Sequence, residues 1–310
     1  MNSLKGKDCL TLADFSKDEL WAILELSRDL KEKHKKGKQT HLLKGKTLGM
    51  IFQKSSTRTR VSFEVGMWQL GGYALFLSAQ DLQVGRGEPV QDTARTLARY
   101  LEGIMIRTFS HREVEDLARF ASIPVINGLT DLLHPCQALA DLFTIWESKA
   151  ALKGVNVAFV GDGNNVANSL LLGCSKLGVN IVLASPGGYR VDQEILDKAK
   201  ILALEEGGRV ELADDPQKAV QGAQVIYTDV WASMGQEEET ESRVKAFQGY
   251  QVDSRLLALA HKDAIVLHCL PAHRGEEITE EVIEGSHSRV WGQAENRLHT
   301  QKALMALLMA

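Results

Sequence analysis

The stretch TLGMIFQKSSTRTRVSFEVGMWQL, residues 47–70, joins a strand-like run to a helix-like run. Residues 47–53 are almost continuously apolar over the length of a buried strand, and residues 58–70 have the spacing of a helix. A buried strand that passes through a short polar turn directly into a helix is typical of a parallel sheet. This stretch therefore predicts an α/β fold.

The same alternation continues in both directions, and it starts afresh at Lys153-Gly154. At roughly 100–200 residues per domain, a chain of 310 residues is expected to form two domains. We expect open parallel sheets in domains 1–150 and 151–295, with a terminal helix over 296–310. The predicted strands are 47–53, 73–78, 103–108, 124–127, 155–160, 180–184, 209–212, 224–228 and 264–270, and a helix over 135–149 ends the first half.

The composition is that of an ordinary globular protein, with 44% hydrophobic and 25% charged residues. The net charge of -4 gives no general attraction to nucleic acid or to acidic membranes. No apolar run is long enough to span a membrane, and the N-terminus lacks the apolar core of a signal peptide. The four cysteines lie far apart, without the spacing of a disulfide framework or a zinc site. We therefore expect a cytoplasmic protein with reduced thiols and no bound metal.

Residues 54–60, KSSTRTR, form the first candidate site because they open a helix directly after a buried strand. Such a turn offers backbone N–H groups, hydroxyls and guanidinium groups to phosphate oxygens. Arg107, at the end of another apolar run, adds a cation that a ligand could pair. The alternative is a helix cap of Ser and Thr followed by solvated arginines.

A second candidate lies at the start of the helix over 135–149. Pro135 suits a first helical turn, so His134 and Gln137 would lie at the helix start, near the carboxyl edge of the sheet where ligands collect. His134 could there polarise a carbonyl group. A single histidine is, however, more often a structural residue.

In the second half, Gly161-Asp162-Gly163-Asn164-Asn165-Val166 follows a strand and opens a helix, as in a dinucleotide site. Val166 stands where that motif has its third glycine, and no acidic residue ends the next strand. We therefore expect Asn165 to reach a small ligand instead.

Two further strand ends carry chemically active groups. Asp229 could hold an ammonium group or simply cap a turn, and Cys269 could be a small core residue or a group that handles protons. Residues 230–250 show little periodicity, so we expect an irregular segment that closes over a ligand.

Taken together and in this order, the motifs resemble those of the ornithine carbamoyltransferase family, from about Leu10 to Leu307. The resemblance implies two α/β domains joined by two interdomain helices, the first binding carbamoyl phosphate and the second binding L-ornithine, with the terminal helix returning to the first domain. It also implies a homotrimer, or an assembly of trimers, in which the loop of Gln83 is shared with a neighbouring subunit. It implies an enzyme without metal or cofactor.

The resemblance also assigns residues. For carbamoyl phosphate it implies Ser56, Thr57, Arg58, Thr59, Gln83, Arg107, His134, Gln137, Cys269, Leu270 and Arg297. For ornithine it implies Asn165, Asp229, Ser233 and Met234. Catalytic roles fall to Arg107, His134, Asp229 and Cys269, with Cys269 as the family's proposed proton acceptor.

Other readings remain. Aspartate carbamoyltransferases have a Pro-Leu-Pro element where this chain has Cys269-Leu270-Pro271, and they use a lysine in the borrowed loop; acetylornithine-type relatives carry a proline-rich insertion that this chain lacks. A nicotinamide-dependent oxidoreductase would bind NAD. A non-catalytic sensor would bind carbamoyl phosphate and form no product.

Overall fold

The computed structural model describes residues 4–82, 87–232 and 237–310. Within them the chain forms two compact units, one of residues 1–140 together with 296–310, and the other of residues 141–295. Two helices, α5 (Pro135–Lys149) and α12 (Val290–Met309), each contribute residues to both units. The sequence predicts a domain boundary after residue 150, beyond the end of α5, whereas the two compact units divide inside α5, after residue 140.

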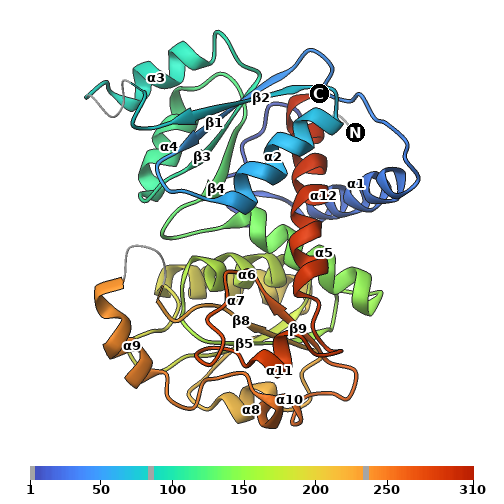
Figure 1. Cartoon of the computed structure of the whole chain (residues 1–310), viewed down its shortest axis with the longest axis vertical. Coiled ribbons are helices and arrows are strands. Elements are labelled where there is room, and N and C mark those ends of the chain that lie inside the picture. The colour runs from blue at the N-terminus through green and yellow to red at the C-terminus, as the bar shows by residue number, and fades with distance from the viewer. Residues whose placement is uncertain (1–3, 83–86, 233–236) are drawn as a thin grey trace. The chain divides into compact units, whose positions relative to one another are not determined.

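Unit 1 contains a four-stranded parallel sheet in the order β2-β1-β3-β4. The helices α3 and α4 cover one face of this sheet, and α2 and α12 cover the other (Figure 1). A further helix, α1 (Lys17–Lys35), begins at a capping box formed by Ser16 and Glu19. The remaining bounds are β1 (Thr47–Phe52), α2 (Thr57–Gln69), β2 (Tyr73–Ser78), α3 (Val90–Leu97), β3 (Gly103–Arg107), α4 (His111–Phe120) and β4 (Val125–Leu129).

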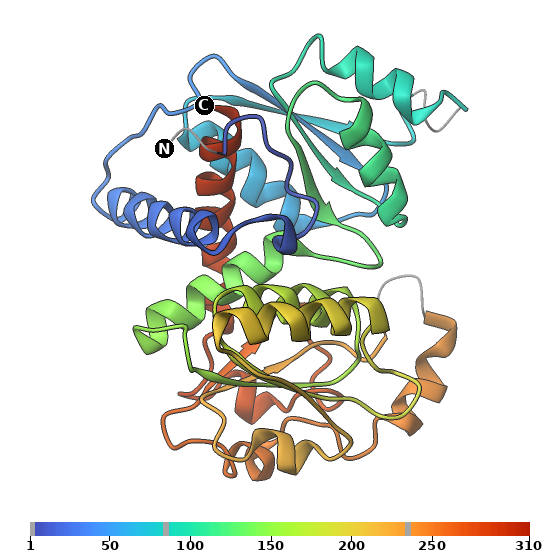
Figure 2. The same cartoon turned by 180° about the vertical axis from the view of Figure 1, so that it is seen from behind.

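Unit 2 contains a five-stranded parallel sheet in the order β7-β6-β5-β8-β9. In Figure 2 the helices α6 and α7 lie together over one face, while α8, α10 and α11 pack on the core of the other face. The bounds are β5 (Asn156–Val160), α6 (Asn165–Lys176), β6 (Asn180–Ala184), α7 (Gln193–Glu206), β7 (Val210–Ala213), α8 (Pro216–Val220), β8 (Val225–Thr228), α9 (Thr240–Ala246), α10 (Ser254–Leu257), β9 (Ile265–His268) and α11 (Glu280–Ile283).

Both sheets have a point at which the strand order reverses, between β1 and β3 in unit 1 and between β5 and β8 in unit 2. In open parallel sheets, ligands bind outside the carboxyl ends of the strands at such points. The predicted fold class, two parallel-sheet α/β domains, is confirmed.

Two predicted elements are wrong in detail. The last strand was predicted over 264–270 but ends at His268, because Leu270 adopts a left-handed backbone with φ of 60° and leaves the sheet. The segment 230–250 was predicted to be irregular, yet it contains the helix α9, and Trp231, Phe247 and Tyr250 lie in the core of unit 2. These three buried residues are separated by polar residues, so no hydrophobic periodicity is visible in the sequence of this segment.

Candidate active site

The start of α2 lies at the carboxyl end of β1, as the KSSTRTR motif predicts. Ser56 is the N-cap residue, and its hydroxyl oxygen accepts a hydrogen bond from the backbone N–H of Thr59 at 3.2 Å. The Ser56 hydroxyl keeps its own proton for donation, and the first-turn N–H groups of a helix have no carbonyl partner inside it. The turn can therefore present several donors to an anion.

A pocket of about 680 Å³ opens beside this turn. It brings together the turn itself, the cations Lys54 and Arg60, and the carboxyl end of β2. Its lining consists of Phe52, Gln53, Lys54, Ser55, Ser56, Thr57, Arg60, Phe76, Ser78, Ala79 and Gln80. A pocket at a strand end that combines a helix start with two cations, as this one does beside its apolar side chains, can accept a small anion.

His134 lies directly before α5, and its carbonyl oxygen accepts hydrogen bonds from the first turn of that helix. Burial, together with the positive charges of Arg297, Arg107 and Arg58, holds the pKa of His134 well below its usual range. The imidazole is therefore neutral at physiological pH, while the three guanidinium groups around it remain charged. This cluster can donate hydrogen bonds to an anionic or carbonyl oxygen.

Arg297, on α12, is held in place by residues from three parts of unit 1. Its Nη1 donates to Gln137 Oε1 at 2.7 Å, and its Nη2 donates to Thr59 Oγ1 at 3.3 Å. With its amide oxygen turned toward Arg297, Gln301 accepts two further hydrogen bonds from the guanidinium group. The structure thus brings the predicted Thr59, Gln137 and Arg297 into direct contact.

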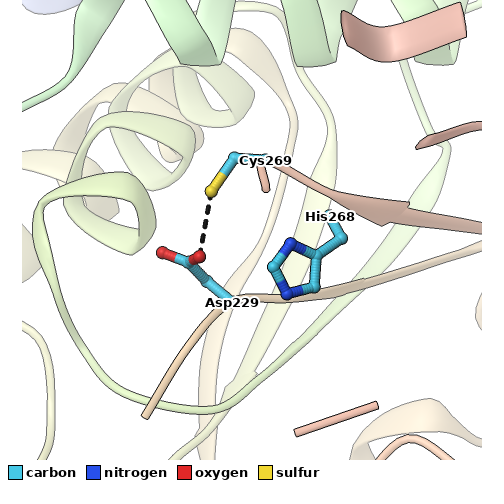
Figure 3. A group of neighbouring side chains, drawn as sticks. All are labelled: Asp229, His268 and Cys269. Carbon is cyan, nitrogen blue, oxygen red and sulfur yellow. Dashed lines mark hydrogen bonds between the residues drawn. The ribbon is translucent and has the colours of Figure 1, made fainter. Parts of the chain in front are cut away.

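In unit 2, Asp229 follows β8 and Cys269 follows β9, so both lie at the carboxyl edge of the sheet. The Cys269 thiol donates a hydrogen bond to Asp229 Oδ1 at 2.9 Å (Figure 3). The other carboxylate oxygen, Oδ2, accepts from Asn164 Nδ2 at 2.8 Å. Asp229 is only 4% exposed, whereas Cys269 is half-buried, so the carboxylate of this pair is shielded from water while the thiol stays partly accessible.

The backbone after Cys269 is held by a buried histidine. His268 Nδ1 accepts the backbone N–H of Leu270 at 2.9 Å, while its Nε2 lies 2.9 Å from Glu277 Oε1. Leu270 has a left-handed backbone that a branched residue adopts only under strain. The His268 contact therefore helps to fix the predicted Cys269 and Leu270.

Asp229, His268 and Cys269 also place three potential metal ligands within 4.8 Å of one another. Figure 3 shows the imidazole of His268 beside the Asp229–Cys269 pair. Both imidazole nitrogens already serve as hydrogen-bonding groups, toward Leu270 and Glu277. The donor set therefore suits proton handling better than metal coordination.

Asn165 is the first residue of α6, immediately after the N-cap Asn164. The sequence assigned a ligand role to Asn165 and missed Asn164, whose side chain both caps the helix and contacts Asp229. The sequence signal for the cap was present, since Asn is a favoured N-cap residue. The predicted Gln83, Ser233 and Met234 lie outside the described residues.

One further buried charge was missed by the sequence interpretation. Arg243, on α9, forms an ion pair with Asp162 at 3.0 Å, and both side chains are less than 10% exposed. Burial raises the pKa of Asp162 to about 6, although the charge of Arg243 opposes the increase. No local pattern marks this pair, because its members are distant in the sequence.

Two family models match the chain. The carbamoyl-P binding domain of the aspartate/ornithine carbamoyltransferases matches residues 7–147, and the Asp/Orn binding domain matches residues 153–308. Together they cover nearly the whole chain and both of its sheets.

Individual relatives agree with these matches. The ornithine carbamoyltransferases of Pyrococcus abyssi and Oceanobacillus iheyensis are 58% and 59% identical over 99% of this chain, covering 97% and 95% of their own lengths. The solved ornithine carbamoyltransferase of Pyrococcus furiosus superposes with a TM-score of 0.97 at 57% identity, covering 100% of this chain and 99% of its own. The family resemblance inferred from the motifs is confirmed, and the chain belongs to the aspartate/ornithine carbamoyltransferase family.

Proposed function

We propose that this chain is an ornithine carbamoyltransferase, which transfers the carbamoyl group of carbamoyl phosphate to the δ-amine of L-ornithine and releases L-citrulline and phosphate. The observation that carries the proposal is the hydrogen bond from Cys269 to Asp229, in a domain that matches an Asp/Orn binding model. A thiol beside a carboxylate suits an amine that must lose a proton as it attacks. The relatives from Pyrococcus abyssi and Oceanobacillus iheyensis are both named ornithine carbamoyltransferase, which supports the proposal.

Carbamoyl phosphate is assigned to unit 1. Ser56, Thr57, Arg58 and Thr59 are proposed to hold the phosphate at the start of α2, with Arg107 beside them. The neutral His134 is proposed to donate to the carbamoyl oxygen, where charge develops during attack, and Gln137 to orient the carbamoyl group with Arg297. Removing one such donor typically costs about 10²- to 10³-fold in rate.

Ornithine is assigned to unit 2, with Asp229, Asn165, Ser233 and Met234 as its proposed binding residues, and Cys269 and Leu270 completing the site. An aliphatic amine is largely protonated at neutral pH, so a group must accept its proton. Cys269 as thiolate, Asp229 and the leaving phosphate are the three candidates. The developing carbon–nitrogen bond forms as the carbon–oxygen bond to phosphate breaks, and no redox step occurs.

We further propose a homotrimer, or an assembly of trimers, in which the Gln83 loop serves a neighbouring subunit. Unit 1 carries an exposed apolar surface that supports an association. Trp68 on α2 is 75% exposed and Tyr73 on the edge strand β2 is 64% exposed. Exposed aromatic side chains of this kind are enriched at interfaces between proteins.

A cytoplasmic location and a role in arginine biosynthesis are part of the same proposal. No helix in the described ranges is long and apolar enough to cross a membrane. All four cysteines carry free thiols, as is usual in a reducing compartment. The relative from Pyrococcus furiosus, 58% identical, is named as an anabolic ornithine carbamoyltransferase, which favours the biosynthetic direction.

The proposal is tested by measuring product formation with carbamoyl phosphate and four acceptors in parallel, namely ornithine, acetylornithine, putrescine and aspartate. Citrulline formation selective for ornithine is the expected result. Turnover of only another acceptor would overturn the assignment of ornithine. Binding of carbamoyl phosphate without turnover would indicate a sensor, and binding of NAD would indicate an oxidoreductase.

The proton-handling role of the Cys269–Asp229 pair has its own prediction. Cys269→Ala and Asp229→Asn are expected to lower kcat with ornithine by about 10²-fold or more, while the circular dichroism spectrum stays that of the wild type. A variant with wild-type kinetics removes its residue from the mechanism. Steady-state citrulline assays with ornithine measure kcat, and circular dichroism of the same preparations measures the fold.

A further inference from the structure

Arg243 is a buried cation that no step of the proposed reaction uses. It lies on α9, is 6% exposed, and reaches acceptors in three places. Its Nη1 lies 3.0 Å from Asp162 Oδ2 and 2.8 Å from the carbonyl oxygen of Trp231, and its Nε donates to Glu239 Oε2 at 2.9 Å. A planar guanidinium group can serve several acceptors in fixed directions, which an ammonium group cannot.

The contact with Trp231 leads to Asp229 along the chain. Trp231 follows Asp229 by two residues, and its indole stacks on Phe247 with ring centroids 5.5 Å apart. Arg243 therefore restrains the backbone immediately after Asp229, whose carboxylate accepts the hydrogen bond of Cys269.

The contact with Asp162 leads to Asp229 from another side. Asp162 belongs to the loop between β5 and α6. Asn164, two residues later in this loop, donates to Asp229 Oδ2 at 2.8 Å. This loop packs closely against its surroundings, since a Cβ on Gly163 would lie 2.1 Å from the backbone nitrogen of Val191. A displacement of Asp162 would therefore pass to Asn164 rather than be absorbed locally.

These two routes converge on one carboxylate. We infer that Arg243, together with Asp162, is a positioning pair that sets the place of Asp229 and thereby of its hydrogen bond with Cys269. The inference deepens the proposed function and rests on it for the identity of the acceptor. It assigns to Arg243 no contact with substrate.

A purely structural role would be the fastening of α9 to unit 2. Arg243 also lies over the ring of Tyr189, 4.9 Å from its centroid, and Tyr189 packs on Phe247. Loss of such a fastening lowers stability and the amount of active enzyme, but it leaves the Michaelis constants and the environment of Cys269 unchanged. Those two quantities therefore separate the two roles.

The test uses the full chain with Arg243→Lys, Asp162→Asn and the double variant. Arg190→Lys is the matched control, because Arg190 pairs with Asp214 on the surface of the same unit. We expect the KM for ornithine to rise about tenfold or more in both single variants, with the KM for carbamoyl phosphate changed less than about threefold. The double variant is expected to be no worse than the more affected single variant, because either change breaks the same interaction.

A second measurement does not depend on activity. Cys269 is the only cysteine of the four that is not buried, so iodoacetamide alkylates it selectively. A carboxylate beside a thiol disfavours the thiolate, so displacing Asp229 is expected to speed alkylation by about threefold or more at fixed pH. Arg190→Lys is expected to react at the wild-type rate.

Unchanged ornithine KM and unchanged alkylation in both single variants overturn the positioning role. If the wild type makes no citrulline, the proposed function fails, and the alkylation rates alone then decide the inference. Faster alkylation in Arg243→Lys with no change in Asp162→Asn also overturns it, because the pair would then not act as a unit.

Discussion

At the scale of single residues, the candidate site in unit 1 separates charge between two kinds of side chain. The guanidinium groups of Arg58, Arg107 and Arg297 stay charged, although Arg107 and Arg297 are buried, whereas the imidazole of His134 gives up its proton. A neutral imidazole can donate to a carbonyl oxygen without competing with the arginines for a phosphate dianion. In the proposed reaction, anion binding and carbonyl polarisation are therefore carried out by different groups.

The neutral state of His134 has a consequence for stability. Its pKa in the folded chain lies below the unfolded value of about 6.5, so the unfolded state binds a proton first as the pH falls. The free energy of unfolding should therefore fall below about pH 6.5, by at most about 1.4 kcal/mol per pH unit from this group, and show no such slope above about pH 7.5. His134→Gln should remove that part of the slope.

Urea unfolding of the wild type and of His134→Gln at about pH 5, 6, 7 and 8 measures this difference. His261→Gln is the control, because the side chain of His261 is 46% exposed. A slope in His134→Gln equal to that of the wild type would show that His134 is not held neutral in the folded chain.

At the scale of elements, each candidate site depends on where a helix begins. The N-cap Ser56 starts α2 at the end of β1, and the N-cap Asn164 starts α6 after β5. Both helices begin beside the point at which the strand order of their sheet reverses. Ser56 thus caps α2 and is proposed to bind phosphate, whereas Asn164 caps α6 and contacts Asp229.

Asn164 allows the two roles to be separated. Asn164→Ser keeps an oxygen that can cap α6 but removes the donor to the buried Asp229, so the free energy of unfolding should fall by about 1–3 kcal/mol and kcat/KM for ornithine by about tenfold. Asn164→Ala removes the cap as well and should destabilise the chain by about a further 1 kcal/mol. Urea unfolding and citrulline assays on the two variants give both quantities; wild-type kinetics in Asn164→Ser would contradict the link to Asp229.

The elements also show what the sequence alone can predict. Buried parallel strands are continuous apolar runs, so their positions are predicted to within one or two residues, as for 103–108 and 155–160. The segment 230–250 escaped prediction because Trp231, Phe247 and Tyr250 meet only through tertiary packing. Its closure over a ligand stays a prediction.

The candidate site was predictable to a similar degree. Strand-end residues such as Arg107 and Asp229 stand out because polar groups there interrupt apolar runs. Contacts such as Arg243–Asp162 and Arg297–Thr59 cannot be predicted in this way, because they join residues far apart in the chain. The resemblance supplied Arg297, and only the structure supplied Arg243.

At the scale of the whole molecule, the exposed apolar surface of α2 and β2 leads to a prediction about assembly. Trp68→Asp combined with Tyr73→Asp places two charges on that surface, so the proposed trimer should dissociate toward single chains of 34.2 kDa. Light scattering coupled to size exclusion measures the mass. Leu204→Asp, at an 83% exposed position on α7, is the control.

Activity should fall together with the mass, because the proposed site borrows a loop from a neighbour. A double variant that stays trimeric would exclude this surface from the interface. A single chain that keeps full activity would contradict the shared loop.

Because α12 returns to unit 1, the proposed site in that unit contains residues that are synthesised at very different times. Ser56 and Thr59 leave the ribosome more than 230 residues before Arg297 and before the Met305 and Met309 side chains that are buried with the first sheet. A nascent chain without α12 therefore has one face of that sheet covered only by α2, and its proposed phosphate site lacks Arg297. In the proposed site, phosphate contacts residues from both parts of the sequence, so a nascent chain that lacks Arg297 should bind phosphate more weakly than the folded chain.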